Sequence, residues 1–283
     1  MLLLLTACNQ ELQADVKIPA VTSVFPTNTP LALQTTPIPA TPTEIFSSAQ
    51  ALVSGPIHIV TVGDDFTHGD GDKSGAGYPS RLLEIVSQIR PVSTLANLGQ
   101  SGWTSNDLIK GKGVLSSQLS QALGEVKSAA AQRQATLVLV WIGGNDLWEL
   151  YTGTNKVTAA DETQDALRFS QNIDTILSKL EKAGAQIIIA KLDDQSKQPA
   201  RTRGQTYPDI SASELLQMSA QVQRYNEVIA ARADEYGALT VDFSNTDIFT
   251  NPATLAGDGF HPNPAGYDLI AQAWYKSVIK ILP

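Results

Sequence analysis

The sequence predicts a doubly wound α/β/α sandwich built around a five-stranded parallel sheet. Between residues 56 and 283, short apolar and β-branched runs alternate with longer segments of helical periodicity. Runs such as Leu137–Val140 contain no polar residue, which is typical of strands that helices cover on both faces. Of the 283 residues 42% are hydrophobic, which is enough to bury a sizeable core. We therefore expect one folded domain over residues 56–283.

Five short apolar runs are predicted to form the strands, and no internal repeat relates them. In chain order they are Ile57–Gly63, Val92–Gly99, Thr136–Gly143, Gln186–Leu192 and Leu239–Phe243. Their number and spacing fit one sheet with a helix in most connections.

Capping residues mark the predicted helices. The clearest helix opens with a capping box over Ser211–Glu214 and closes at Gly237. One face of this helix is apolar and is assigned to the core, through Leu215, Met218, Val222, Tyr225 and Ile229. A second helix is expected over about Asp161–Ala183. The last begins at Asn263-Pro264, where asparagine caps the helix and proline fills its first turn.

The first 55 residues are predicted to lie outside the folded domain. Residues 1–8 end in Leu5-Thr6-Ala7-Cys8, which resembles the lipobox of bacterial lipoproteins, whose cysteine is lipidated and becomes the new N-terminus. Only five residues precede Thr6, fewer than a signal peptide needs, so we expect the natural start to lie upstream. Residues 9–55 are predicted to be a tether, because six prolines and seven threonines fall between Pro19 and Thr43. Its typical reach is about 35 to 40 Å.

Charge and cysteine content exclude several classes of function. The formal net charge is −8, the wrong sign for a protein that binds nucleic acid. No apolar run approaches the roughly 18 residues that span a bilayer. The single cysteine, Cys8, excludes an internal disulfide and a Cys-rich zinc site. Membrane contact is therefore expected only through a lipid on Cys8, at an extracytoplasmic surface.

The loops that follow the predicted strands carry the chemistry, because ligands of such sheets bind beyond the carboxyl ends of the strands. The four informative segments are residues 63–71, 97–104, 143–146 and 258–262. In the last of them Asp258 stands three residues before His261, so its carboxylate can orient the imidazole and stabilise its protonated form. A backbone N–H together with the amide of Asn145 can hold a developing oxyanion. These are components for acyl transfer.

In this combination and order the four segments resemble the SGNH hydrolases, also called the GDSL family, over residues 57–283. The resemblance implies a flavodoxin-like sheet and hydrolysis of a carboxylic ester. It makes His261 the general base and Asp258 its orienting carboxylate. It also makes the backbone N–H of Gly102 and the side-chain amide of Asn145 the oxyanion donors. Neither a metal nor an organic cofactor is implied.

The nucleophile position departs from the family pattern. The family's first block reads Gly-Asp-Ser, whereas this chain reads Gly63-Asp64-Asp65, so Asp65 occupies the serine position. Its carboxylate disfavours the charge that an oxyanion hole favours, by on the order of a few kcal/mol, although its backbone N–H can still serve the hole. Three roles remain open. Asp65 attacks the acyl carbon and forms a mixed anhydride, or positions a water with His261, or forms an ion pair with protonated His261 and leaves a binding fold.

Other residues near these segments receive assignments of their own. Asp64 is predicted to be structural, accepting hydrogen bonds from nearby backbone N–H groups, and His58 to be structural at the start of the first strand. Candidates for lining the cleft are His68, Trp103, Trp148 and the polar stretch Asp193–Tyr207. For the two tryptophans simple packing is an equal alternative.

Three related patterns fail on particular residues. The loop from Asp70 to Gly75 imitates the start of a calcium loop, but its twelfth position is Arg81 instead of glutamate. A haloacid-dehalogenase phosphatase needs a second aspartate two residues after its first, which is missing here. A receiver domain needs a lysine after the fifth strand, where this chain has Phe243-Ser244.

The sequence therefore favours a surface-anchored hydrolase of carboxylic esters, acting on acylated glycans or lipids, with Asp65 altering its mechanism. The alternative is a non-catalytic module that binds an acylated or glycan ligand in the same cleft.

Overall fold

The computed structural model describes residues 55–75, 77–152, 156–202 and 210–282. The predicted lipobox with Cys8, and all but the last residue of the predicted tether, lie outside the described residues. Within them, no helix combines the length and apolar character that a membrane crossing requires.

A parallel five-stranded sheet forms the middle of the fold, with strand order β2-β1-β3-β4-β5. The strands are β1 (Ile57–Gly63), β2 (Thr94–Asn97), β3 (Ala135–Trp141), β4 (Gln186–Lys191) and β5 (Leu239–Asp242). The predicted fold class is confirmed, and β1 has the predicted bounds. The second strand is shorter than predicted. It pairs with β1 alone, and the chain enters it from a turn in which Val92 adopts a φ of 58°.

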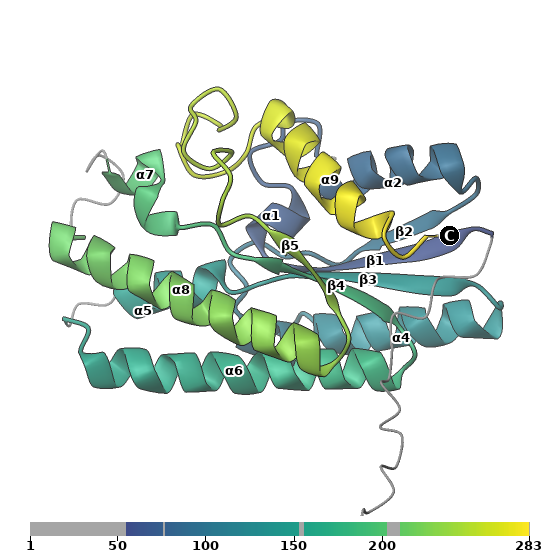
Figure 1. The fold of residues 1–283 in the computed structure, drawn as a ribbon, viewed down its shortest axis with the longest axis horizontal. Helices are drawn as coiled ribbons and strands as arrows, with labels where there is room; N and C mark the ends of the chain where they lie inside the picture. The colour runs from purple at the N-terminus through teal and green to yellow at the C-terminus, as the bar shows by residue number, and fades with distance from the viewer. Residues whose placement is uncertain (1–54, 76, 153–155, 203–209, 283) are drawn as a thin grey trace, which may run out of the picture. The chain divides into compact units, whose positions relative to one another are not determined.

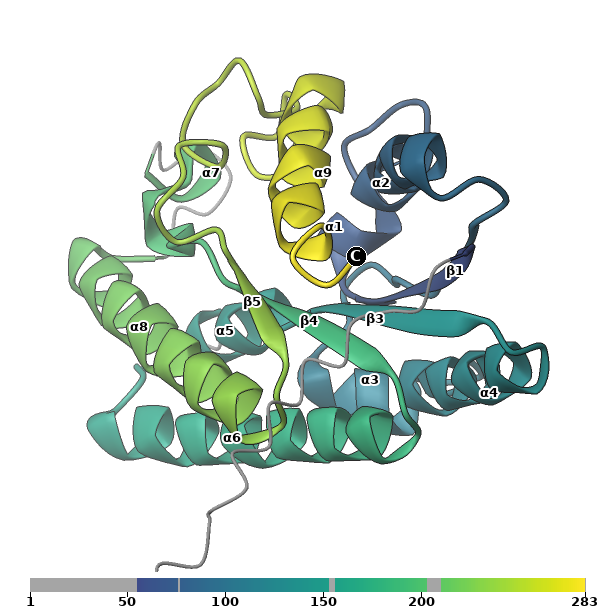
Figure 2. The same cartoon turned by 45° about the vertical axis from the view of Figure 1, so that its right-hand side comes forward.

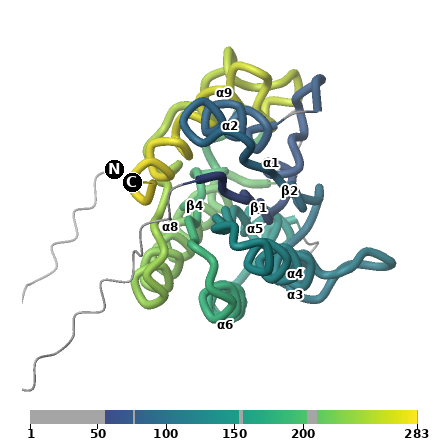
Figure 3. Tube along the Cα trace, turned by 90° about the vertical axis from the view of Figure 1, so that its right-hand side faces the viewer, coloured from purple at the N-terminus to yellow at the C-terminus, as the bar shows by residue number. Residues whose placement is uncertain are grey.

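Helices cover both faces of the sheet (Figures 1 and 2). One face carries α1 (Asp65–His68), α2 (Gly77–Ile89) and α9 (Pro264–Val278). The other carries α3 (Ser105–Lys110), α4 (Gln118–Ala131), α5 (Gly144–Tyr151), α6 (Ala159–Lys182) and α8 (Ala212–Glu235). Figure 3 looks along the sheet, with α2 and α9 above it and α4 and α6 below. A 3₁₀ turn, η1 (Gln195–Lys197), and the short α7 (Pro199–Thr202) lie between β4 and α8.

The predicted helix caps are present. Ser211 and Glu214 form the capping box of α8, and the side chain of Asn263 accepts the N–H of Gly266 at the start of α9. On the predicted apolar face of α8 only Leu215 is not fully buried. Helix α6 begins two residues before the predicted start, because Thr158 caps it.

An aromatic cluster supports the sheet edge where the strands end. The rings of Trp141, at the end of β3, and Phe243, just after β5, stack with centroids 4.3 Å apart. Phe66 packs against Trp141 and against Phe260, with centroids 5.1 and 5.6 Å away. Since Phe66 follows Asp65 and Phe260 precedes His261, this packing fixes the segment of Asp65 relative to that of His261.

Candidate active site

The structure brings the five predicted site residues together at the carboxyl edge of the sheet. Asp65 begins α1 directly after β1, Gly102 lies in the loop after β2, and Asn145 lies in the first turn of α5 after β3. Asp258 and His261 come from the loop that leads into α9. Segments almost 200 residues apart in the chain thus meet at one place.

Two glycines allow the loop after β2 to reach α1. A Cβ atom at Gly99 would lie 2.5 Å from the backbone nitrogen of His68, so only glycine permits this approach. Gly102 adopts a φ of 70°, a left-handed conformation that glycine reaches without strain. The loop presents the N–H of Gly102 to the side chain of Asp65.

The carboxylate of Asp65 occupies both predicted oxyanion donors. The Gly102 N–H donates to its Oδ1 at 3.1 Å, and the Asn145 amide donates to its Oδ2 at 2.6 Å. The Asn145 amide also donates to the carbonyl of Trp103 at 3.3 Å. The groups that would stabilise a negative charge on a substrate therefore hold a negative charge that belongs to the protein.

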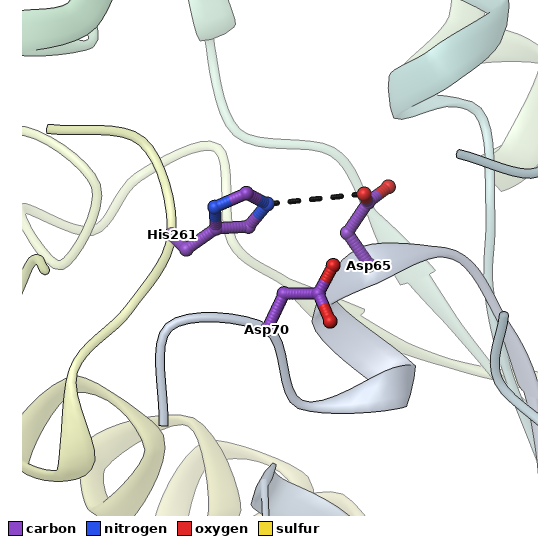
Figure 4. Close-up of side chains that lie close together, drawn as sticks. All are labelled: Asp65, Asp70 and His261. Carbon is purple, nitrogen blue, oxygen red and sulfur yellow. Dashed lines mark ion pairs between the residues drawn. The ribbon is translucent and has the colours of Figure 1, made fainter. Parts of the chain in front are cut away.

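The predicted base is held as expected. His261 Nδ1 lies 2.7 Å from Asp258 Oδ2, while Asp258 Oδ1 accepts the backbone N–H groups of Phe260 and His261 at 2.9 and 3.0 Å. The other ring nitrogen, Nε2, lies 3.8 Å from Asp65 Oδ1 (Figure 4). Nε2 is buried and has no hydrogen-bond partner among the described residues.

The charges in the site stabilise one another. Burial opposes charge on His261, but the carboxylates of Asp65 and Asp258 outweigh it and raise the pKa of the imidazole above its usual value. Burial likewise opposes charge on Asp65, but contacts with His261 and Asn145 lower the pKa of that carboxyl. The geometry thus favours an ionised pair between Asp65 and His261.

Asp64 has the structural part that the sequence predicts. It caps α1, where its Oδ1 accepts the N–H of Phe66 at 3.3 Å. Complete burial, and then the charge of Asp65, raise the pKa of Asp64 well above its usual value. Asp193, also buried, has its pKa raised by burial to about 7.

Sequence reasoning missed a buried network beneath the oxyanion donors. Asp146 Oδ2 accepts the N–H of Ser105 at 2.7 Å, and its Oδ1 accepts the Ser105 hydroxyl at 2.6 Å. Asn172 on α6 donates to that hydroxyl at 2.8 Å. Burial raises the pKa of Asp146 to about 6. Because Asp146 follows Asn145, the network ties the Asn145 turn to the start of α3. The Asn145-Asp146 pair was the sequence signal that could have revealed it.

The candidate lining residues separate into two groups. Trp103 is buried and borders a hollow that Leu115 also lines. The Arg201 guanidinium, within the predicted polar stretch, lies 3.8 Å from the centroid of the Trp148 ring and 5.4 Å from that of Phe260. It therefore links α5 to the loop of His261. The part of the stretch over residues 203–207 lies outside the described residues.

The remaining predictions concern two histidines and the imitated calcium loop. His58 lies 2.8 Å from the hydroxyl of Thr94 and 3.0 Å from Glu125, in a structural setting as predicted. His68 is exposed at the rim, where its Nδ1 is 2.5 Å from Asp70 and 3.1 Å from Ser101. In the imitated calcium loop, Arg81 donates to Asp72 at 2.5 Å.

Fold and site together define an α/β protein in which a histidine–carboxylate pair faces a carboxylate held by an amide and a backbone N–H. The chain belongs to the GDSL-like lipase/acylhydrolase family, whose model matches residues 61–269.

Three similar proteins are named as two esterases and a phospholipase. A multidomain esterase of Ruminococcus flavefaciens is 24% identical over 238 residues, which are 80% of this chain and 29% of the esterase. An acetyl xylan esterase of Geobacillus stearothermophilus is 21% identical with a TM-score of 0.51, and the match covers 79% of this chain and 95% of the esterase. Phospholipase A1 of Streptomyces albidoflavus is 18% identical with a TM-score of 0.53, covering 80% of this chain and 99% of the phospholipase. The two structural matches show the shared fold.

Proposed function

We propose that this protein hydrolyses carboxylic esters of acylated glycans or lipids, with water in place of a serine as the nucleophile. The observation that carries the proposal is the intact His261–Asp258 pair, whose Nε2 makes no hydrogen bond among the described residues and faces Asp65. Membership of the GDSL-like family supports the reaction class. The acetyl xylan and phospholipid named for the similar structures indicate acylated glycans and lipids as substrates to test.

The reaction requires the side chain of Asp65 to leave the oxyanion donors. A substrate carbonyl oxygen then accepts the N–H of Gly102 and the amide of Asn145. Water attacks the acyl carbon while its proton passes to Nε2 of His261, and collapse of the tetrahedral intermediate returns that proton to the leaving alkoxide. Asp258 stabilises the imidazolium in between. Because displacing a bound carboxylate costs free energy, we expect a slow enzyme.

The pH dependence follows from the pKa of His261. Only the neutral imidazole accepts a proton, and the raised pKa keeps the ring protonated to higher pH than usual. The hydrolysis rate should therefore increase with pH through the neutral range.

A second candidate function is a non-catalytic binding module for the same class of ligand. The hydrogen bonds from Gly102 and Asn145 to the carboxylate of Asp65 favour it, since they fill the position of a substrate oxyanion. A ligand of this module would bind in the cleft without turnover.

A screen of the full chain against short-chain aryl esters and acetylated sugars tests the proposal. We expect slow hydrolysis that is lost in His261→Ala. The absence of turnover, or equal turnover by the folded His261→Ala variant, would contradict the hydrolase and favour the binding module.

The location is also proposed from the sequence. We propose that the protein is exported and anchored through a diacylglyceryl group on Cys8, whose two acyl chains suffice for stable attachment. The support is the Leu5-Thr6-Ala7-Cys8 segment followed by a Pro/Thr-rich stretch. When the protein is expressed from its natural gene, Cys8→Ser should move it from the membrane fraction to the soluble exported fraction. Equal membrane association of both forms would contradict the anchor.

A further inference from the structure

A third side chain, that of Asp70, lies close to those of Asp65 and His261. One carboxylate oxygen each of Asp65 and Asp70, and one ring nitrogen of His261, all lie within 4.8 Å of one another (Figure 4). Asp70 had no part in the predicted site. It is brought there by Gly69, which ends α1 with a φ of 104° and turns the chain back.

The loop that carries Asp70 packs directly against the loop of His261. A Cβ atom at Gly71 would lie 2.6 Å from Cβ of His261 and 2.6 Å from the carbonyl oxygen of Pro262, so glycine is required at this contact. The backbone N–H of Asp70 also donates to the carbonyl of Asp65 at 3.0 Å. The three side chains are therefore positioned by close backbone packing instead of meeting at the tips of mobile loops.

The imidazole is oriented like that of a metal-bound histidine. Its Nδ1 is held by Asp258 at 2.7 Å, and a carboxylate on the far ring nitrogen is the usual partner of a histidine that binds metal through the other. The near nitrogen, Nε2, is buried and makes no hydrogen bond among the described residues, and its ion-pair contact with Asp65 is 3.8 Å long. This missing hydrogen bond is a second observation beside the carboxylates, and an ion bound there would displace the proton of Nε2.

The separation between the ligand atoms of His261 and Asp65 fits a shared ion. Nε2 of His261 lies 3.8 Å from Oδ1 of Asp65, which is too long for a hydrogen bond. Two ligands that each lie about 2.0 to 2.2 Å from one ion are separated by a little less than about 4 Å when the angle at the ion is wide. A cation between the two atoms would satisfy both.

The ligand types indicate which ion. One imidazole and two carboxylates suit Zn²⁺, Mn²⁺, Co²⁺ or Fe²⁺, whereas Ca²⁺ and Mg²⁺ prefer oxygen ligands alone. Each oxygen of Asp65 that accepts a hydrogen bond from Gly102 or Asn145 keeps a second lone pair for an ion.

We propose that Asp65, Asp70 and His261 form a binding site for a divalent transition-metal ion, with Zn²⁺ the tightest of those named. Water or a ligand oxygen completes the coordination. The binding does not depend on the proposed hydrolysis. It has a consequence for that function, however, because Nε2 cannot coordinate an ion and accept a proton from water at once.

Zinc titration of the chelator-treated full chain by calorimetry tests the site. The Cys8→Ser form is used so that a free thiol does not bind the metal. We expect one ion per chain, with an affinity at least about tenfold lower in Asp70→Asn and no such binding in His261→Ala. Asp268→Asn, which removes an exposed carboxylate of α9 that contacts Arg81, is the matched control and should bind as the parent does. No binding by the parent, or equal affinity in all variants, would overturn the proposal.

A second measurement needs no variant at the site and so does not depend on how a substitution folds. Paramagnetic Mn²⁺ added to the Cys8→Ser protein should broaden the NMR signals of His261 at low occupancy, while those of His58, held by Thr94 and Glu125 on the far part of β1, remain sharp. Equal broadening of the two histidines, or none, would overturn the proposal. A failed ester screen in the presence of chelator would leave these binding results as they are.

Discussion

The loop after β1 differs from the loops after β3 and before α9 in the kind of charge it brings to the site. The loop after β3 and the loop before α9 supply an amide donor, Asn145, and a histidine paired with a carboxylate, which are groups that stabilise a negative charge and move a proton. The loop after β1 supplies the negative charge itself, on Asp65. Donors that suit an oxyanion can thus be occupied by a carboxylate of the same chain.

Two adjacent carboxyl groups, those of Asp64 and Asp65, have opposite pKa shifts. Asp64 is buried, and burial followed by the charge of Asp65 raises its pKa well above the usual value. For Asp65, burial opposes the charge in the same way, but contacts with His261 and Asn145 lower the pKa. The partners at each position, and not the residue type, determine which carboxyl is charged.

Asp65→Ser should change the hydrolysis rate more than any other substitution, because it removes the negative charge that the loop after β1 brings to the site. The substitution frees Gly102 and Asn145 and places a hydroxyl near Nε2 of His261. General-base catalysis and an oxyanion donor are each worth about 10²-fold or more, so activity on an activated aryl ester should increase by at least about 10²-fold over the parent. The initial rate of aryl ester hydrolysis measures the gain, and Asp65→Ser with His261→Ala is the control that should lose it.

Two outcomes would change the role proposed for Asp65 or the proposed hydrolysis. If the parent and a folded Asp65→Ser protein are both inert, the cleft has lost more than its nucleophile and the binding module is preferred. If the parent turns over ester and Asp65→Ser slows it, Asp65 itself takes part in catalysis.

Asp146→Ala should show how much the hydrogen bonds between Asp146 and Ser105 stabilise the protein. The variant leaves the N–H and hydroxyl of Ser105 without their buried acceptor, and each such loss costs about 1 to 3 kcal/mol. We expect the free energy of unfolding, measured in urea, to fall by about 3 kcal/mol. Asp146→Asn, which keeps one acceptor oxygen, should fall by less. A change below about 0.5 kcal/mol in Asp146→Ala would show that the network contributes no stability.

Asp193→Asn tests the effect of burying a carboxyl group that has no part in the proposed reaction. The quantity measured is the free energy of unfolding as a function of pH. The folded pKa of about 7 lies above that of the unfolded chain, so the folded state binds the proton more tightly. The resulting stability is full below about pH 4 and is lost as the pH rises toward 7. Between pH 5 and 8 the Asn variant should therefore lose less stability than the parent, by at least about 1 kcal/mol. Asp234→Asn controls for net charge, and parallel profiles of the parent and Asp193→Asn would contradict the prediction.

The sequence predicted the sheet and the meeting of the site residues because both follow from local patterns. Strand β1 and the caps at Ser211 and Asn263 are encoded in a few adjacent residues. The short β2 was not predicted, since the turn at Val92 depends on backbone conformation and not on hydrophobicity.

Within the site, the sequence placed a carboxylate near the oxyanion donors but did not reveal that it accepts hydrogen bonds from both. The place of Asp70 was also missed, and for Arg201 only its stretch was predicted to line the cleft and not its contact with Trp148. Both places are set by tertiary contacts, the first through the packing of Gly71 on His261 and the second through the Trp148 ring. No periodicity or spacing in the chain encodes such contacts.

The anion of Asp65 is held by the two predicted oxyanion donors, Gly102 and Asn145, and an NMR titration of the side-chain carboxyl carbons is the direct test. In metal-free protein, the same series of spectra reports Asp65 and its neighbour Asp64. We predict a pKa for Asp65 below the usual value of about 3.9 and a pKa for Asp64 well above it. A pKa for Asp65 at or above its usual value would contradict this, because the contacts with Asn145 and His261 would then not outweigh the effect of burial.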